Sequence, residues 1–209
     1  MSKGLSGVRA DQKHSYRSLE HCANQIRGYL GLAPDKALNV LDLFEHLDAI
    51  SIKLRDGTVI PFRGGVVSLE NSEGYTRYDR QKNVIEILAS EQTYCWLEIG
   101  HPRGAYFVAH EIGHCVLHTD QLVRLAQMPT DQQAAFHRGQ EDHKPFEDTE
   151  WQANAFASAL LMPAQGLRGL EEKHGELTVA LIAKQFGVSE EAATYRLELF
   201  RNRRSDLLS

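Results

Sequence analysis

The chain has 209 residues, of which 42% are hydrophobic, and its 28 acidic and 23 basic side chains give a net charge of −5. This length and apolar content allow one domain with a buried core, and the negative charge excludes a general electrostatic attraction to nucleic acid. The first residues lack the apolar stretch of a signal peptide and no run is long enough to span a membrane, so we expect a cytoplasmic protein without membrane contacts. Three cysteines without CxxC spacing predict reduced thiols.

The N-terminal half contains two helical patterns followed by short strand patterns. Residues 15–30 have the apolar and polar pattern of an amphipathic helix, and Asn39 can cap a second helix that runs to about residue 48. Four β-like runs follow, separated by Gly and by Asn or Asp turns, at residues 50–54, 65–69, 74–78 and 83–87. They predict a small, mainly antiparallel sheet whose edge could hold an extended peptide by strand addition.

The most informative segment is the HExxH motif formed by residues 110–114. Residues four apart share one face of a helix, so His110 and His114 can converge on one tetrahedral metal ion, which we expect to be Zn²⁺. Glu111 can then reach a water bound to that metal and act on its proton. Apolar neighbours on both sides predict one largely buried helix over about residues 103–119, backed by the sheet. The alternative is a core helix whose histidines find only hydrogen-bond partners.

A catalytic zinc usually takes three protein ligands, so the third must come from elsewhere. A metzincin is excluded because Leu117 and Asp120 stand where that class needs Gly and His. His118 is on the same helix face but lies two turns from His110, roughly 12 Å along the axis, which is too far for one ion to bridge. We therefore expect His118 to be a neighbouring or substrate-facing residue.

Glu150 is the best candidate for the third ligand. Residues 147–156 predict a second helix, capped near Asp148 or Thr149, on which Glu150 and Asn154 face the same way. Glu150 can bind the metal while Asn154 hydrogen-bonds a group in contact with it, such as a His ring, and fixes its orientation. The alternative for Glu150 is an ordinary carboxylate favoured by the helix dipole.

The link between these two helices, residues 119–147, is long and polar, with a short helix expected from Met128 to about Phe136. Loops of this length are often functional, so it borders the active-site cleft or is a solvated insertion. His137 and His143 in this link, or a Tyr from elsewhere, are candidates to stabilise the oxyanion.

The C-terminal segment has the pattern of a helix-turn-helix, with helices over residues 177–186 and 190–200 and Ser189 as the cap of the second. That second helix opens with Glu190 and Glu191, and phosphate repulsion disfavours major-groove reading by it. We therefore interpret the pair as a packing element. The basic residues Arg201, Arg203 and Arg204 are a solvated tail or a contact for single-stranded nucleic acid.

Three segments together resemble the ImmA/IrrE family of bacterial metallopeptidases: AHEIGHCVLH at 109–118, EWQANAFA at 150–157 and LLMP at 160–163. The matching region spans roughly residues 103–200. The resemblance implies a gluzincin-like site in which His110, His114 and Glu150 hold zinc and Glu111 is the catalytic base. It also implies a regulatory protease that cleaves a helix-turn-helix repressor encoded nearby, in DNA-damage, mobile-element or phage-defence responses. Whether the chain belongs to the CapP type of phage-defence operons stays open.

These observations predict an α+β protein with a zincin-like metallopeptidase domain over residues 1–165 and a helical, helix-turn-helix-like subdomain over 166–209. Single-stranded DNA is a candidate activator. The competing interpretations are a DNA-binding regulator with a structural zinc and a catalytically dead scaffold that only binds a repressor. A structural site would need a fourth ligand, for which Cys95 is one candidate. Cys95 could instead occupy the water position and hold the enzyme latent, as a cysteine switch.

Overall fold

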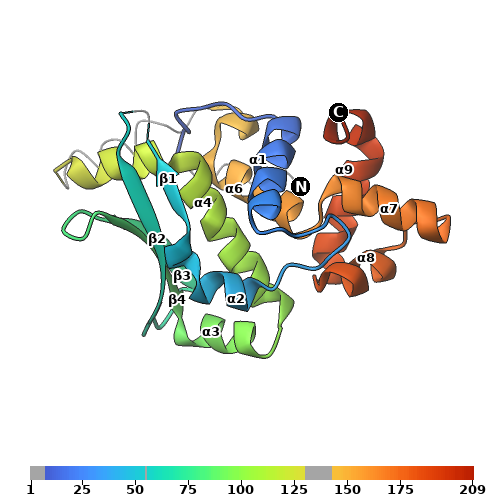
Figure 1. Cartoon of the computed structure of the whole chain (residues 1–209), viewed down its shortest axis with the longest axis horizontal. Helices are drawn as coiled ribbons and strands as arrows, with labels where there is room; N and C mark the ends of the chain where they lie inside the picture. Colours follow the sequence, from blue (N-terminus) through green and yellow to red (C-terminus); the bar gives the residue numbers. More distant parts are fainter. Residues whose placement is uncertain (1–7, 55, 130–142) are drawn as a thin grey trace.

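A computed structural model describes residues 8–54, 56–129 and 143–209. Among these residues, one mixed sheet contains four strands in the order β1–β2–β4–β3. Their bounds are β1 Ser51–Lys53, β2 Val59–Val67, β3 Gly74–Asp79 and β4 Val84–Ser90. The α+β class is confirmed (Figure 1).

The strand pairing is only partly what the sequence predicts. The β1–β2 and β3–β4 pairs are antiparallel, but the central β2–β4 pair is parallel. Strand β2 also begins at Val59, six residues before the predicted run at 65–69. The sequence pattern missed this first part because Pro61 and Gly64 interrupt its alternation of apolar and polar residues. Alternation predicts that a strand exists but does not specify its partner, and a parallel partner is reached only through a distant segment of chain.

The sheet is covered by helices on one face, and its other face is open (Figure 1). Every residue of β4 is buried, and Ile85, Ile87 and Ala89 join the same core as Phe107 and Val108 of the following long helix. Strand β3 lies at the edge of the sheet, beside this helix. The fold therefore places an edge strand next to the HExxH motif.

The helices begin close to the positions that the sequence predicts. Ser15, Asn39, Asp148 and Ser189 each accept a hydrogen bond from a backbone N–H in the first turn of the helix that follows. The bounds are α1 Tyr16–Tyr29, α2 Val40–Glu45, η1 Leu47–Ala49, α3 Glu91–Glu98, α4 Pro102–Gln127, η2 Pro145–Glu147, α6 Thr149–Leu161, α7 Ala164–His174, α8 Val179–Phe186 and α9 Glu190–Leu207. Helices α3 and α7 have no counterpart in the sequence prediction. No helix in the described ranges combines the length and apolarity needed to cross a membrane.

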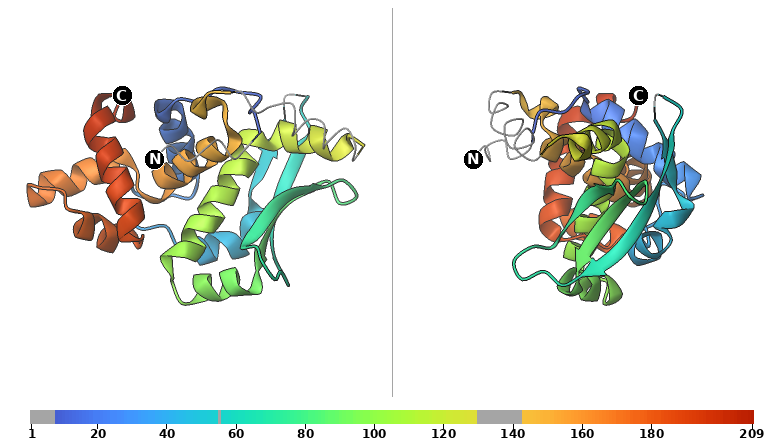
Figure 2. Two further views of the ribbon diagram at one scale, coloured as in Figure 1. Left: turned by 180° about the vertical axis from the view of Figure 1, so that it is seen from behind. Right: turned by 90° about the vertical axis from the view of Figure 1, so that its left-hand side faces the viewer.

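Helix α4 carries the HExxH motif and breaks at His118, whose φ of −122° and ψ of 15° are not helical. The hydroxyl of Thr119 donates to the carbonyl of Cys115 beside the break. The part after the break runs at a steep angle to the first part (Figures 1 and 2). The sequence predicted a polar link from residue 119 onward. This prediction is wrong for residues 119–127, because α4 continues to Gln127. The expected helix from Met128 to Phe136 and His137 lie almost entirely outside the described residues.

Helices α4 and α6 pack closely because Gly113 has no side chain. A Cβ at this position would lie 3.1 Å from the Cα and 3.2 Å from the carbonyl oxygen of Ala153 in α6. These distances are tighter than ordinary van der Waals contact, so only glycine allows this separation of the two backbones without a shift. Gly113 lies one residue before His114, and the close approach therefore brings the motif next to the first turn of α6.

The C-terminal helices form the end of the molecule opposite the sheet (Figure 1). Gly187 ends α8 in the left-handed conformation, with φ of +66°, and Ser189 caps α9, which gives the predicted helix-turn-helix. The pair is fastened to α1 by a buried ion pair in which Arg196 Nη2 donates to Glu20 Oε2 over 2.6 Å. The division into domains at residues 165 and 166 stays a prediction.

Candidate metal centre

The structure brings His110, His114 and Glu150 together. The Nε2 atoms of the two histidines lie 3.0 Å apart, and each lies 3.2 Å from a different carboxylate oxygen of Glu150. One ligand atom from each residue lies within 4.8 Å of the others. The two histidine side chains are about 15% exposed and that of Glu150 is 35% exposed, so a small ion can enter while bulk water stays at one side.

The far side of the His110 ring is held by Asn154, one turn along α6 from Glu150. Asn154 Oδ1 lies 3.1 Å from His110 Nδ1, and the hydroxyl of Tyr106 also donates to this amide oxygen. An amide oxygen only accepts hydrogen bonds, so His110 must carry its proton on Nδ1. In the neutral ring, Nε2 then presents a lone pair to His114 and Glu150.

The electrostatics of the cluster follow from this close approach. Hydrogen bonds with His110 and His114 hold the pKa of Glu150 well below its usual value, so the carboxylate is ionised. Burial lowers the pKa of His110, but the hydrogen bond with Glu150 and the charges of Glu111 and Glu150 outweigh it, and the pKa is raised overall. An ionised carboxylate and two imidazole nitrogens that converge in this way form a donor set that fits a divalent cation such as Zn²⁺.

His118 lies behind His114 and is buried. Its Nδ1 lies 3.1 Å from His114 Nδ1, and its Nε2 lies 3.0 Å from Gln152 Oε1. Burial lowers the pKa of His118 to about 3, so its ring is neutral. His118 is thus a neighbour of the cluster, and it also contributes to the lining of the cleft in front of the cluster.

Glu111 is 8% exposed and is held from across the fold by a residue that sequence reasoning missed. Thr76 of β3 donates its hydroxyl hydrogen to Glu111 Oε2 over 2.6 Å. The strand containing Thr76 was predicted, but nothing in its pattern indicated which residue of α4 it would face. The contact holds Oε2 of Glu111 in place, and because the carboxylate is rigid, it also sets the direction in which Oε1 points.

A cleft of about 290 Å³ opens in front of the cluster. Its lining comes from the N-terminal segment, the edge strand, both parts of α4 and the start of α6: Val8, Gly74, Tyr75, Thr76, His110, Glu111, His114, His118, Gln121, Leu122, Leu125, Thr149 and Glu150. The polar motif residues therefore share the cleft with an apolar side made by Val8, Leu122 and Leu125. Leu122 and Leu125 reach this side because α4 continues past its break.

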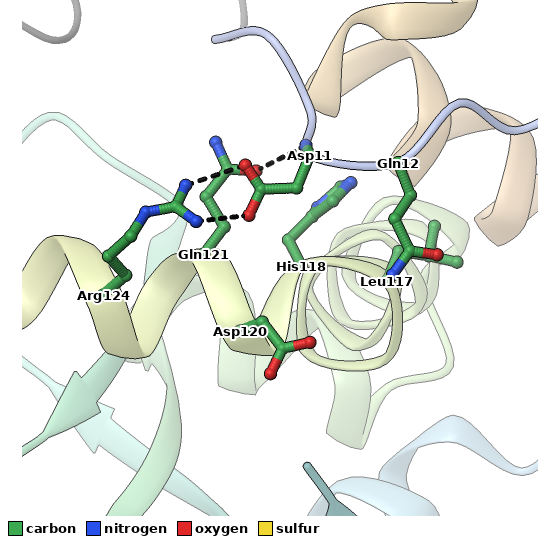
Figure 3. A pocket seen from close by; sticks show the side chains of 7 residues that line it. All are labelled: Asp11, Gln12, Leu117, His118, Asp120, Gln121 and Arg124. Carbon is green, nitrogen blue, oxygen red and sulfur yellow. Dashed lines mark hydrogen bonds and ion pairs between the residues drawn. The ribbon is translucent and has the colours of Figure 1, made fainter. Parts of the chain in front are cut away.

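A second pocket of about 180 Å³ lies beside His118 (Figure 3). It is lined by Asp11, Gln12, Leu117, His118, Asp120, Gln121 and Arg124. Arg124 binds both carboxylate oxygens of Asp11 at 2.7 Å, and the backbone N–H of Asp11 donates to Gln121. These contacts hold the N-terminal segment against the second part of α4.

Two candidate residues lie away from the cluster. Cys95 is exposed on α3, because Thr93 and Leu97 form the buried side of that helix, and it belongs neither to the cluster nor to the cleft. The structure therefore does not bring Cys95 to the position required of a fourth ligand or a cysteine switch. His143 is buried, with its Nε2 3.0 Å from Asp148 Oδ2, and does not line the cleft.

Two comparisons relate this chain to known proteins. Residues 101–198 match the family model Peptidase_M78, described as the IrrE N-terminal-like domain. A solved structure described as a Mycobacterium tuberculosis transcriptional regulator is similar at 19% identity and a TM-score of 0.49, over 87% of this chain and 55% of that one. This chain thus spans about half the length of that protein. A search among curated proteins gave no match. The match over residues 101–198 confirms that this part of the chain resembles the ImmA/IrrE metallopeptidases.

Proposed function

We propose that the chain is a zinc-dependent endopeptidase that cleaves a helix-turn-helix transcriptional repressor. The observation that carries this proposal is the meeting of His110, His114 and Glu150 beside Glu111, at the base of a cleft bordered by an edge strand. Metal ligands, a carboxylate base and an extended binding surface are the parts that peptide hydrolysis by a metal enzyme needs.

His110, His114 and Glu150 would hold the metal. Bound Zn²⁺ supplies a Lewis acid for the peptide carbonyl and lowers the pKa of water toward 7. The three side chains supply two neutral nitrogens and one negative charge, which leaves part of the charge of the ion to act on substrate. A closed structural site would need a fourth protein ligand, and the cluster found among the described residues contains three.

Glu111 acts as the general base in this proposal. Its Oε2 is engaged by Thr76, so Oε1 is the atom that accepts the proton of the attacking water. The same carboxyl group then donates that proton to the nitrogen of the leaving amine. Its low exposure keeps the proton from exchanging freely with bulk water during this transfer.

The cleft suits an extended peptide. Strand β3 is the edge of the sheet and contributes Gly74, Tyr75 and Thr76 to the cleft, so a substrate segment can add to it as a further strand. Tyr75 is 39% exposed, and its hydroxyl is a candidate to stabilise the oxyanion. The apolar residues Leu122 and Leu125 would face a side chain of the substrate.

The partner and the context follow from the family resemblance. We infer a repressor encoded beside this chain, cleaved in a stress, DNA-damage or phage-defence response, with single-stranded DNA as a candidate activator. A role of the C-terminal helices as a DNA reader is less well supported, because α9 begins with Glu190 and Glu191.

The test is to incubate the purified chain with the product of its neighbouring gene and to follow intact mass. The reaction is run with added Zn²⁺, with a chelator, and with and without single-stranded DNA. We expect cleavage that needs the metal and falls by about 10²- to 10⁴-fold in Glu111→Gln, the range for loss of a general base. Glu172→Gln is the matched control, because this carboxylate is exposed on α7 at the other end of the fold.

The outcomes separate the alternatives. Retained cleavage by Glu111→Gln would remove Glu111 as the base. Binding of the repressor without cleavage, in the presence of zinc, would favour a non-catalytic scaffold. Sequence-specific binding of duplex DNA that survives alanine at Glu111 would favour a DNA-binding regulator with a structural zinc.

A further inference from the structure

We propose that His118 is a positioning residue that fixes the proton of His114 on Nδ1 and so directs the His114 Nε2 lone pair at the metal. This inference rests on the metal site of the proposed function, but it does not require that the chain cleave a peptide. It is carried by a continuous series of hydrogen bonds that leads from the backbone through Gln152 and His118 to His114.

The series begins at Gln152, whose amide can point in only one direction. Gln152 Nε2 donates to the carbonyl oxygen of Gln12 over 2.8 Å and to that of Phe146 over 2.9 Å. The reverse orientation would place the amide oxygen of a fully buried side chain against two carbonyl oxygens. Gln152 Oε1 therefore faces His118 and acts as an acceptor.

The orientation of Gln152 determines the protonation of His118. Because Gln152 Oε1 accepts, His118 Nε2 must carry a hydrogen and donate it over 3.0 Å. His118 is 4% exposed and hydrogen-bonds a ring and an amide, neither of which carries a negative charge. A second proton on this ring would be a buried charge without a counter-ion in direct contact, so His118 Nδ1 is bare and acts as an acceptor.

His114 must then be the donor in its contact with His118. Its Nδ1 lies 3.1 Å from the bare Nδ1 of His118. The metal ion that would separate the two Nε2 lone pairs would lie with Glu150 on the other side of the His114 ring, so this Nδ1 contact is favourable only with a hydrogen on His114 Nδ1. The proton of a neutral His114 therefore resides on Nδ1, and its Nε2 lone pair points toward Glu150 Oε1, 3.2 Å away. Asn154 does the same for His110 in one step, so each histidine ligand has a support of its own.

The supports differ in what they connect. Asn154 is on the same helix as Glu150, whereas the Gln152 amide reaches two separate backbone segments, around Gln12 and Phe146. The orientation of His114 thus depends on the contact between the N-terminal segment, at Gln12, and Gln152 of α6. The break of α4 occurs at His118 itself. A change in the angle between the two parts of α4 would therefore move the residue that orients His114.

The experiment compares zinc affinity in the whole chain and in His118→Leu and His118→Gln, by competition with a chelator of known affinity. Leucine removes the acceptor for His114 Nδ1–H, and we expect a loss of about 10- to 100-fold in affinity, the usual effect of losing such a support. Glutamine supplies an acceptor and a donor at similar reach, and we expect it to restore most of the loss. Val188→Ala, in the turn between α8 and α9, is the control for destabilisation remote from the metal.

A spectroscopic measurement tests the proposal without any substitution. Two-bond ¹H–¹⁵N spectra of the histidine rings in the zinc-loaded wild-type protein should show His118 protonated on Nε2 only and His114 protonated on Nδ1. A proton on His118 Nδ1, or unchanged affinity in a folded His118→Leu, would overturn the inference. If the wild-type protein binds no zinc, the metal site itself is wrong, and the proposed function fails together with the inference.

Discussion

Two polar clusters of this molecule differ in how their hydrogen-bond donors and acceptors are matched. At the junction of α1 with the C-terminal helices, Glu20 accepts from Arg196 Nη2 and from the backbone N–H of Ala164, each over 2.6 Å. Arg196 Nε donates to the carbonyl of Met162 over 2.7 Å. Each of these acceptors faces a donor, and the side chains of Glu20 and Arg196 are at most 4% exposed. This cluster closes on itself.

At the metal centre, by contrast, acceptors face one another without donors between them. The ring protons of His110 and His114 point away from the cluster, toward Asn154 and His118, so the space between the ligands is lined by lone pairs. A carboxylate adds further acceptors there. The difference teaches that buried polar residues alone do not mark a functional site, since an excess of acceptors at one point is what requires a cation.

The largest expected effect is on the closed cluster. Glu20→Ala leaves the Arg196 guanidinium buried without its carboxylate and should lower the free energy of unfolding by about 3–5 kcal/mol. Urea unfolding measures this loss, and the zinc affinity of the folded protein should not change. Glu171→Ala, which breaks the partly exposed pair with Arg204, is the control and should cost only about 0–1 kcal/mol. A fall in zinc affinity for Glu20→Ala would mean that the two clusters are coupled.

The acceptor-rich cluster should respond in the reverse way. Glu150→Ala should weaken zinc binding by at least about 100-fold, because it removes one of three ligands. In the presence of chelator the free energy of unfolding should change by less than about 1 kcal/mol, since this carboxylate is partly exposed. Chelator competition and urea unfolding measure the two quantities. A large loss of stability without metal would contradict the comparison and place Glu150 among structural residues.

The next effect concerns the close contact of the two ligand-bearing helices. Gly113→Ala places a Cβ 3.1 Å from Ala153 Cα, and the resulting shift of α4 from α6 should cost about 1–3 kcal/mol and also weaken zinc binding. Gly169→Ala, in helix α7 with open space around its Cβ, is the matched control and should stabilise the protein by up to about 1 kcal/mol. Both are measured by urea unfolding and zinc titration. Unchanged affinity in Gly113→Ala would show that the ligands tolerate a change in helix separation.

The smallest effect should come from the contact that orients Glu111. Thr76→Val removes a hydrogen bond to a carboxylate and should lower kcat about tenfold, with KM and zinc affinity unchanged. Thr76→Ser keeps the hydroxyl and should retain most of the activity. Steady-state cleavage of the repressor gives kcat and KM. An equal loss in the serine variant would assign the effect to packing of the threonine methyl group and not to the hydrogen bond.

The amino-acid sequence by itself determined the local parts of the site. The spacing of His110 and His114, and that of Glu150 and Asn154, is fixed by helix geometry, because residues four apart share a face wherever the helix lies. The caps at Asn39 and Ser189 were likewise predictable, since a cap involves only neighbouring residues. Local geometry was therefore sufficient for the motif, although not for Cys95, whose chemistry suggested a role that its position does not support.

Only the tertiary structure decided which distant residues support that motif. Thr76 meets Glu111 across 35 positions of sequence, and Gln152 meets Gln12 across 140. The parallel β2–β4 pair and the break of α4 at His118 were also invisible in the periodicity. Such contacts depend on how whole elements pack, and a repeating pattern of apolar residues specifies a buried face without naming the residue that will cover it.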